Sequence, residues 1–179
     1  NGKGSITAFL ESICSLANIK IGVTTSPHLL EITERIRVNQ TQIKIQTFEY
    51  LLEDIQKKVS EFRLTPFELI ICCALKYFES NNVELIILEA GLGGRLDATT
   101  AHNLRPIIAI GNIGLDHTEY LGNSIEKITQ EKISVIKKDS FVVSCKQDHK
   151  VEKLINKRVE SIGAKIFWVQ PLSEDWELG

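Results

Sequence analysis

The sequence predicts an α/β fold in which a mostly parallel sheet is flanked by helices, and two observations carry this prediction. Residues 83–88 and 106–110 are nearly continuous apolar runs of strand length, which is typical of strands buried on both faces. Such strands alternate along the chain with segments of helical periodicity. This alternation favours parallel strands that are joined by helices.

The first third of the chain is expected to form a helix, a strand and a hairpin before a second helix. Apolar residues recur at helical spacing over residues 5–18, which predicts an amphipathic helix. Residues 19–25 follow as a short strand. Apolar and polar residues alternate over 36–45, which indicates a hairpin or an extended loop. Helical spacing returns over residues 48–62.

The central helix has a clear start signal. Residues 65–79 open with Thr65 and Pro66, and Glu68 lies three positions after the threonine. This is the pattern of a capped helix N-terminus. The apolar strands described above then follow.

The last third continues the alternation of helix and strand. We expect a helix over residues 125–137, a strand over 141–145 and a further helix over 151–162. Gly163 is placed to end that helix, and a last strand covers residues 164–169.

Composition and charge exclude several classes of protein. Of the 179 residues, 43% are hydrophobic and 25% are charged, and 21 basic against 23 acidic residues give a net charge of −2. This apolar content excludes a disordered chain, and the near-neutral charge gives no electrostatic reason to expect nucleic acid as a partner. No apolar run approaches the roughly 20 residues that span a bilayer, so we expect no membrane partner. Without an internal repeat or linker, residues 1–179 are predicted to be one domain.

The chain has four cysteines, at positions in apolar surroundings: Cys14, Cys72, Cys73 and Cys145. None has C-x-x-C spacing, so neither a zinc site nor a disulfide framework is indicated. We interpret them as buried thiols of a reducing compartment and expect a cytoplasmic protein.

Polar, ionisable and glycine-rich segments follow three of the predicted strands, at residues 26–28, 89–97 and 112–117. Ligands of parallel α/β sheets bind beyond the carboxyl ends of the strands. We therefore expect these three segments to converge on one edge of the sheet, beside the glycine-rich start of the chain.

The start of the chain has the composition of a phosphate-binding loop. Gly2, Lys3, Gly4 and Ser5 lie directly before a predicted helix. Glycines allow backbone N–H groups to approach phosphate oxygens, and the lysine neutralises phosphate charge. In the usual loop a serine or threonine follows the lysine directly, whereas here Gly4 intervenes. A glycine-rich turn that only caps the helix is the alternative.

Two further residues are candidate metal ligands. Glu89 ends a predicted buried strand, where a carboxylate is costly unless it is paired or bound to a metal, and Mg²⁺ is the natural partner beside a triphosphate. The alternative is a helix cap or an ion pair. His117 could contact a metal or a phosphate, or have a purely structural role. The spacing of Gly91, Gly93 and Gly94 does not fit the dinucleotide motif G-x-G-x-x-G.

Six segments match one enzyme family in its order: Asn1-Gly2-Lys3-Gly4-Ser5, Thr25-Ser26-Pro27-His28-Leu29 with Glu34-Arg35-Ile36, Thr65-Pro66-Phe67-Glu68, Glu89 through Thr99, Asn112 through Thr118, and Glu131-Lys132 before Ile136-Lys137. On these segments the chain resembles the folylpolyglutamate synthase/dihydrofolate synthase family, within the Mur-type ATP-dependent amide ligases. The glycine block before Thr99 and the Ile-Gly-Leu-Asp-His-Thr block are highly specific to it.

The resemblance implies an enzyme that joins L-glutamate to a folate-type carboxylate through an acyl phosphate, with ATP and Mg²⁺ as cofactors. By position, the residues that contact ATP are Asn1, Gly2, Lys3, Gly4, Ser5 and Asn112. The residues that match the family's magnesium ligands are Ser26, Glu89 and His117. Its small-molecule partners would be folate or dihydropteroate, L-glutamate and ATP, and we expect a monomer.

The resemblance also implies a catalytic group and a substrate contact region. Lys132 matches a lysine that is carbamylated in the family, and we count Lys132, Lys3 and His117 as catalytic. The segments that match contacts to the pterin-bearing substrate comprise Thr65, Pro66, Phe67, Glu68, Leu96, Asp97 and Ala98. Pro66 and Thr100 depart from the family pattern, which leaves the exact acceptor open.

Relative to this family, we interpret the chain as a Mur-ligase-type P-loop ATPase domain that is truncated at both ends. Its first strand, the start of the phosphate loop and the C-terminal glutamate-ligase domain would be missing. We therefore expect little or no ligase activity from this polypeptide alone. Two alternatives stay open: another Mur-type amide ligase, and a non-catalytic nucleotide-binding module.

Overall fold

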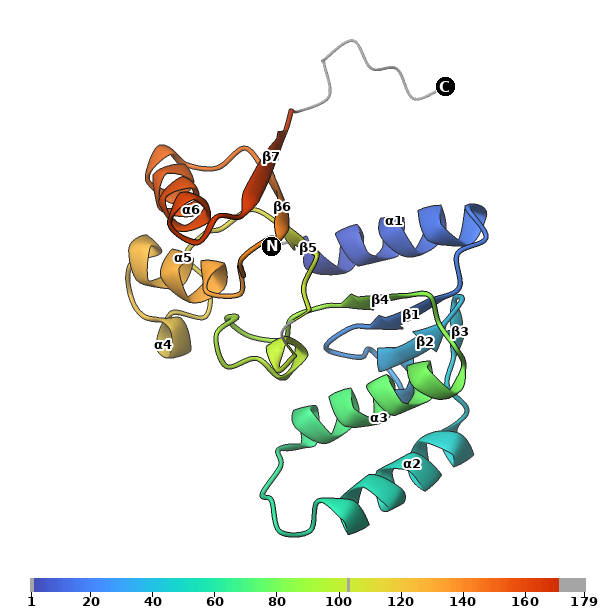
Figure 1. The fold of residues 1–179 in the computed structure, drawn as a ribbon. Helices are drawn as coiled ribbons and strands as arrows, with labels where there is room; N and C mark the ends of the chain where they lie inside the picture. The colour runs from blue at the N-terminus through green and yellow to red at the C-terminus, as the bar shows by residue number, and fades with distance from the viewer. Residues whose placement is uncertain (1, 103, 171–179) are drawn as a thin grey trace. The chain divides into compact units, whose positions relative to one another are not determined.

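The computed structural model describes residues 2–102 and 104–170, which form two compact units (Figure 1). The first unit runs from Lys3 to Gly91. The second unit comprises the described residues from Leu92 onward together with Gly2. Each unit contains one sheet and the helices that cover it, and each is described by itself below.

The first unit contains a four-stranded sheet in the order β3-β2-β1-β4. Its elements are α1 (Lys3–Leu16), β1 (Ile21–Thr24), a 3-10 turn (Ile32–Arg35), β2 (Ile36–Val38), β3 (Thr41–Gln42), α2 (Ile45–Lys58), α3 (Pro66–Ser80) and β4 (Leu85–Leu88). Strands β1 and β4 are parallel, and β1–β2 and β2–β3 are antiparallel. Helices α1 and α3 lie on opposite faces of this sheet, and α2 packs on α3 (Figure 1).

A glycine in β1 allows α3 to pack closely on the sheet. Gly22 lies between Val38 and Ile86 in the strand register. A Cβ atom added to Gly22 would lie 2.5–2.9 Å from three ring atoms of Phe78, a side chain on α3 that is fully buried. Only a residue without a side chain fits between the strand and this ring.

Gly22→Ala is therefore expected to destabilise the fold. The added methyl group overpacks a buried aromatic ring, which costs about 1–3 kcal/mol of the free energy of unfolding. Urea denaturation followed by far-UV circular dichroism measures this loss. Gly114→Ala is the control, because a Cβ added there meets no atom within 4 Å. Equal denaturation midpoints for the two variants would contradict the packing described here.

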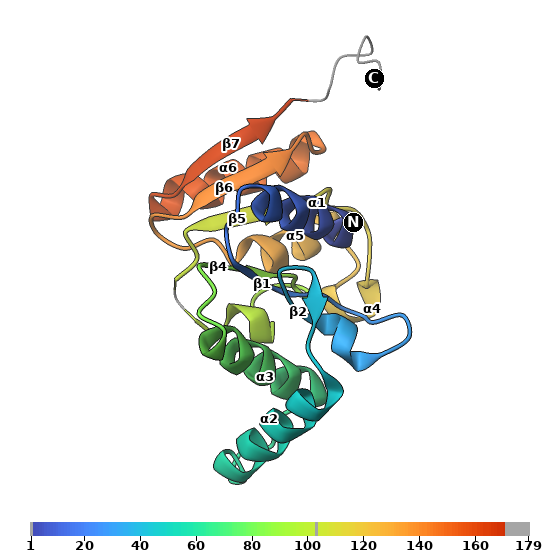
Figure 2. The same ribbon diagram turned by 90° about the vertical axis from the view of Figure 1, so that its right-hand side faces the viewer.

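The second unit contains a parallel three-stranded sheet in the order β5-β6-β7. Its elements are a 3-10 turn (Ala98–Thr100), β5 (Ile107–Ile110), α4 (Thr118–Leu121), α5 (Ile125–Ile133), β6 (Phe141–Cys145), α6 (His149–Ile162) and β7 (Lys165–Val169). Helices α5 and α6 cover one face of this sheet (Figure 2). Helix α6 is capped by the Asp148 side chain at its start and ends at Gly163, which has a left-handed backbone.

The α/β class and the mostly parallel pairing of the strands are confirmed, with the hydrogen bonds defining two sheets instead of one. Of the two alternatives predicted for residues 36–45, a hairpin is found over residues 36–42, and Ile45 already begins α2. The assignment of residues 1–179 to a single ATP-binding domain stays a prediction. No helix among the described residues is both long and apolar enough to cross a membrane.

Three expectations about burial and element bounds are wrong. The strands at 83–88 and 106–110 are not buried on both faces, since Ile86 is 41% and Ile107 is 67% exposed. Each strand lies at the end of its sheet among the described residues. The first helix begins at Lys3 and not after the glycine-rich segment. Two of the four cysteines, Cys72 and Cys145, are only partly buried.

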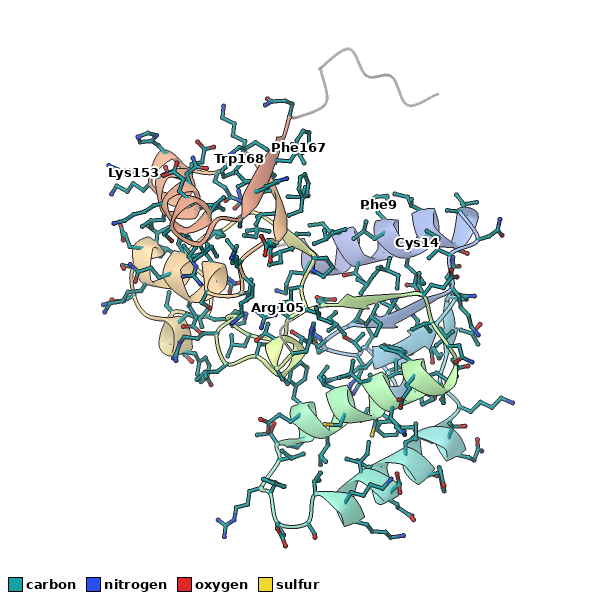
Figure 3. The ribbon with its side chains drawn as sticks, viewed as in Figure 1. Phe9, Cys14, Arg105, Lys153, Phe167 and Trp168 are labelled. Atoms are coloured by element: carbon teal, nitrogen blue, oxygen red, sulfur yellow. The ribbon has the colours of Figure 1, made fainter. Side chains whose placement is uncertain are left out.

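Helix α1 buries a different face from the one that its apolar residues predict. Its buried residues are Thr7, Glu11 and Cys14, which lie on one side at helical spacing. Phe9 and Ile13 are 71% and 60% exposed, and Phe9 lies on the side of α1 that faces away from β1 and β4 (Figure 3). A buried glutamate on this helix needs a partner, which the first unit provides through Arg37.

Candidate functional site

The N-terminus of α1 presents unpaired backbone donors. Lys3, Gly4 and Ser5 form the first turn, in which helix geometry leaves the N–H groups without partners inside the helix. Gly2 precedes it with a φ of +80°, a conformation that favours glycine. No acidic side chain lies in this first turn. Together with the lysine, these groups favour the binding of an anion.

Glu89 follows β4 directly and lies beside this helix start. Its side chain is buried and lies near the backbone N–H of Ser26, and its own N–H donates to the Thr24 carbonyl at 3.2 Å. Burial raises the pKa of the Glu89 carboxyl, and the nearby charge of Lys3, the Ser26 N–H and the charge of Arg37 oppose this rise. The geometry therefore places a buried carboxylate next to the lysine of the candidate phosphate loop.

The helix start approaches the carboxylate closely. A Cβ atom added to Gly4 would lie 4.0 Å from Glu89 Oε2. Lys3, Ser26 and Glu89, which come from three separate segments of the sequence, are thus neighbours in the first unit.

The loop that carries Ser26 is ordered by a second carboxylate. Glu34 accepts hydrogen bonds from the backbone N–H groups of Leu29, Leu30 and Glu31 at 2.7–2.8 Å. These bonds lower the pKa of the Glu34 carboxyl below its ordinary value. The residues that follow Ser26 are therefore held in one conformation by their own sequence.

Thr65, Pro66, Phe67 and Glu68 form the start of α3. The Thr65 hydroxyl accepts from the Glu68 N–H, and the Glu68 carboxylate accepts from the Thr65 N–H at 2.6 Å, which completes a capping box. The backbone N–H and the hydroxyl of Thr65 both donate to the Glu68 carboxylate, and these two bonds lower its pKa. The predicted helix start is confirmed, and the substrate contacts assigned to these residues stay predictions.

In the second unit, the glycine-rich loop packs on α5. A Cβ atom at Gly94 would lie 2.9 Å from the Glu131 carbonyl oxygen and 3.2 Å from that of Lys132. The Glu131 carboxylate accepts from the Arg95 backbone N–H at 3.2 Å and pairs with its guanidinium at 3.3 Å. The loop therefore lies directly against the turn of α5 that carries Lys132.

Asp97 holds the same loop in its conformation through hydrogen bonds to the backbone. Its carboxylate accepts from the backbone N–H groups of Leu92 and Thr99, both at 2.9 Å, and it is buried. Arg105 fixes the end of this segment, because its guanidinium donates to the carbonyls of Val135 and Thr100 (Figure 3). Asp97 thus has a clear structural role, and the substrate contacts of Leu96, Asp97 and Ala98 stay predictions.

The loop after β5 carries Asn112 and His117. Buried Gln147 accepts from the Ile113 N–H at 2.9 Å and donates to the Gly111 carbonyl at 2.9 Å, so it fixes the residues on both sides of Asn112. His117 has a left-handed backbone with φ of 50°, and its Nε2 lies 3.8 Å from Asp116 Oδ2. The sequence contains no signal for the role of Gln147, because its partners are far away along the chain.

The predicted site residues divide between the two units. Those of the first unit are Lys3, Gly4, Ser5, Ser26, Glu89 and residues 65–68, and those of the second are Gly2, Leu96, Asp97, Ala98, Asn112, His117 and Lys132. Asn1 lies outside the described residues. The structure brings Lys3, Ser26 and Glu89 together. The shared magnesium site of Ser26, Glu89 and His117 stays a prediction, because these ligands come from different units.

A metal in this region would need ligands besides carboxylates and imidazoles. Within residues 2–102 and 104–170, no three His, Cys, Asp or Glu side chains gather as a metal site. Mg²⁺ is bound in many sites by one or two carboxylates together with substrate phosphates and water. A buried carboxylate beside a serine and a helix N-terminus fits that chemistry.

The chain is similar in sequence to enzymes of folate metabolism. It is 33% identical to the dihydrofolate synthetase of Saccharomyces cerevisiae over 93% of this chain and 40% of the relative. It is 36% identical to the dihydrofolate synthase/folylpolyglutamate synthase of Buchnera aphidicola, over 98% of this chain and 43% of that relative. The chain thus spans about two fifths of the length of these relatives. No family model matches it.

Solved structures show the same similarity in fold. A structure of Escherichia coli FolC in complex with DHPP and ADP aligns with a TM-score of 0.87 and 33% identity, over 94% of this chain and 40% of that chain. The bifunctional folylpolyglutamate synthase/dihydrofolate synthase of Yersinia pestis, complexed with AMPPNP and a Mn ion, aligns with a TM-score of 0.86 and 34% identity, over 94% and 40% of the two chains.

Proposed function

Because the chain belongs to the dihydrofolate synthase/folylpolyglutamate synthase family, we propose that it forms the part of an ATP-dependent glutamate ligase that binds Mg·ATP. The reaction joins L-glutamate to the carboxylate of dihydropteroate or of a folate. The chain spans about two fifths of the length of these relatives, so this activity is proposed for the protein at their full length. The chain of 179 residues is expected to bind the nucleotide and to have little ligase activity alone.

One observation carries this proposal: Glu89 is buried beside Lys3 and the Ser26 loop. A buried carboxylate raises the free energy of the fold unless it has an ionic partner, and a protein with no use for it would be more stable with an apolar residue. Glu89 together with Ser26 would hold a divalent cation, which would offset the charge of the carboxylate and of nucleotide phosphates. The residues present therefore fit a magnesium site.

Each group of the first unit has a task in the first chemical step. The carboxylate of the acceptor attacks the γ-phosphorus of ATP, the bond to the β-phosphate oxygen breaks, and ADP leaves. Lys3 and the N–H groups of the first turn of α1 would hold the phosphates and offset the negative charge that spreads in the transition state. Ser26 and Glu89 would hold Mg²⁺, which neutralises charge on the β- and γ-phosphates.

The second step forms the amide bond. The amine of L-glutamate attacks the carbonyl carbon of the acyl phosphate, a proton leaves the nitrogen, and inorganic phosphate is released. Lys132 is proposed to act here or in phosphoryl transfer as a carbamylated, anionic side chain, since carbamylation converts a lysine to an anion. Its position on α5 supports this role, because the Gly94 loop packs there and continues into residues 96–98, which are proposed to contact the acceptor.

The residues proposed to contact the acceptor are 65–68 in the first unit and 96–98 in the second unit. Phe67 offers an aromatic face on which a pterin ring could stack, and Leu96 is an exposed apolar side chain. Small-molecule substrates, a monomeric state and a cytoplasmic location complete this proposal. Nucleic acid and membranes have no part in it.

Isothermal titration calorimetry with the chain tests the proposed function. We expect binding of Mg·ATP with one site per chain, and binding of dihydropteroate when nucleotide is present. No binding of Mg·ATP would overturn the proposal. Binding of Mg·ATP without any binding of dihydropteroate or folates would instead favour another Mur-type ligase. A protein at the relatives' full length that has no ligase activity, and whose function in the cell is unchanged by Glu89→Gln, His117→Ala and Lys132→Ala, would favour a non-catalytic nucleotide-binding role.

A further inference from the structure

Arg37 on β2 forms a buried ion pair with Glu11 on α1. Its Nη2 lies 2.7 Å from Glu11 Oε2 and its Nε lies 3.2 Å from Oε1, and the two side chains are 18% and 7% exposed. The two nitrogens meet the two carboxylate oxygens side by side, which is the strong geometry of this pair. The contact joins α1, whose N-terminus carries Lys3, to the sheet.

The same guanidinium also contacts both ends of the loop that carries Ser26. Its Nη1 donates to the Thr25 hydroxyl at 3.2 Å and to the Glu34 carbonyl at 2.8 Å. The two ends of the loop therefore meet at one side chain. Thr25 lies between Ser26 and Thr24, whose carbonyl accepts from the Glu89 N–H at 3.2 Å.

We propose that Arg37 is a positioning residue of the Mg·ATP site, which fixes the Ser26 loop relative to the N-terminus of α1 by holding Glu11, Thr25 and Glu34 together. This inference rests on the proposed function. The first unit has three parts that must hold their mutual positions when ATP and metal bind: the start of α1, the Ser26 loop and Glu89. Arg37 contacts the helix and the loop at once.

The chemistry of arginine suits this task. Its planar group carries five N–H donors in a fixed arrangement, and here they reach a carboxylate, a hydroxyl and a carbonyl. The single ammonium group of lysine cannot reach all three partners from one place. An apolar residue would fill the space without fixing the loop.

A double variant, Glu11→Met with Arg37→Met, separates positioning from stability. Removing both charges leaves no buried unpaired charge at this pair, and apolar residues of similar size replace such pairs with little loss of stability. We expect the double variant to fold with a denaturation midpoint close to that of the wild-type chain. We also expect its affinity for Mg·ATP to fall by about 10-fold, the lower end of what outer-shell partners of metal ligands contribute.

The metal dependence of binding is the informative measurement. Calorimetry with ATP in EDTA reports the contacts of the α1 N-terminus alone, and calorimetry with Mg·ATP reports the Ser26 loop as well. We expect the double variant to bind metal-free ATP as the wild type does and to lose the gain in affinity that Mg²⁺ provides. A purely structural pair would not change this difference between the two titrations.

Two further variants complete the experiment. Arg37→Lys keeps the charge, so it is the test if the double variant does not fold, and we expect it to lose affinity for Mg·ATP too. Asp54→Met with Lys58→Met removes an ion pair on α2 and serves as the control with unchanged binding. A folded double variant or Arg37→Lys variant that binds Mg·ATP as the wild type does would overturn the positioning role. Absence of Mg·ATP binding by the wild-type chain would overturn the proposed function instead.

Discussion

Glu89→Gln is expected to make the chain more stable and to weaken its binding of Mg·ATP in the same substitution. Burial raises the pKa of the Glu89 carboxyl, so the folded chain holds the proton more tightly than the unfolded chain does. Ionisation of the wild-type residue therefore costs stability as the pH rises through the raised pKa. Glutamine keeps the shape and an oxygen near the Ser26 N–H, but it carries no charge.

The difference in the free energy of unfolding between the variant and the wild type is expected to depend on pH. Below the unfolded-state pKa of about 4.3 both proteins carry a neutral side chain at this position, and their free energies of unfolding should agree. At neutral pH the variant should be the more stable protein. Urea denaturation at both pH values, with calorimetric titration of Mg·ATP at neutral pH, measures the two effects. We expect at least about a 10-fold loss of affinity. A less stable variant that still binds Mg·ATP normally would contradict our account of Glu89.

Gly94→Ala is expected to displace the glycine-rich loop from α5. The added Cβ would lie 2.7 Å from Val135 Cγ1 and 2.9 Å from the Glu131 carbonyl oxygen. A backbone carbonyl inside a helix cannot move aside as the end of a side chain can, so the loop itself must shift. The shift would break the contacts between Arg95 and Glu131.

This substitution has two measurable consequences. Overpacking is expected to cost about 1–3 kcal/mol of the free energy of unfolding. In the protein at its relatives' full length, a loop displaced by about 1 Å can lower the ligase rate on the order of 10²-fold. Glu131→Gln is the matched control. It keeps the packing of the loop and removes only the charge of the pair with Arg95, so it measures the part of the loss that comes from this ion pair. A Gly94→Ala variant with wild-type stability and wild-type ligase rate would show that the loop does not depend on its contact with α5.

The sequence predicts the elements whose signals are local. The capping box of α3 needs only Thr65 and Glu68, which are three residues apart, and the structure confirms it. The end of α6 at Gly163 and the hairpin over residues 36–42 have equally local causes. Such features depend on neighbouring residues in the chain, and for that reason periodicity and turn residues suffice to find them.

Features that depend on distant contacts could not be predicted in this way. The apolar residues of α1 indicate one buried face, but the helix buries Thr7, Glu11 and Cys14 instead. This choice makes sense only with Arg37 in place, because the ion pair balances the charge of Glu11. The contact of Gln147 could not be predicted for the same reason, because its partner Ile113 lies 34 residues away along the chain.

The candidate site was predictable in part. Glu89 and the Ser26 segment were expected to meet at the ends of neighbouring strands, and the register of β1 with β4 places them side by side. The substrate contact of Asp97 stays a prediction, and its carboxylate also accepts hydrogen bonds from the backbone N–H groups of Leu92 and Thr99. A carboxylate that follows a glycine-rich loop can serve either purpose, and the sequence pattern is the same for both.

The most direct test of the central claim is a crystal structure of the chain with AMPPNP and Mn²⁺, with the metal located by its anomalous scattering. We predict one Mn²⁺ per chain beside the γ-phosphate, at about 2.1 Å from the Ser26 hydroxyl and from a Glu89 carboxylate oxygen. The phosphates should lie against the first turn of α1. A metal bound away from both Ser26 and Glu89, with the nucleotide phosphates at the same helix start, would contradict the account.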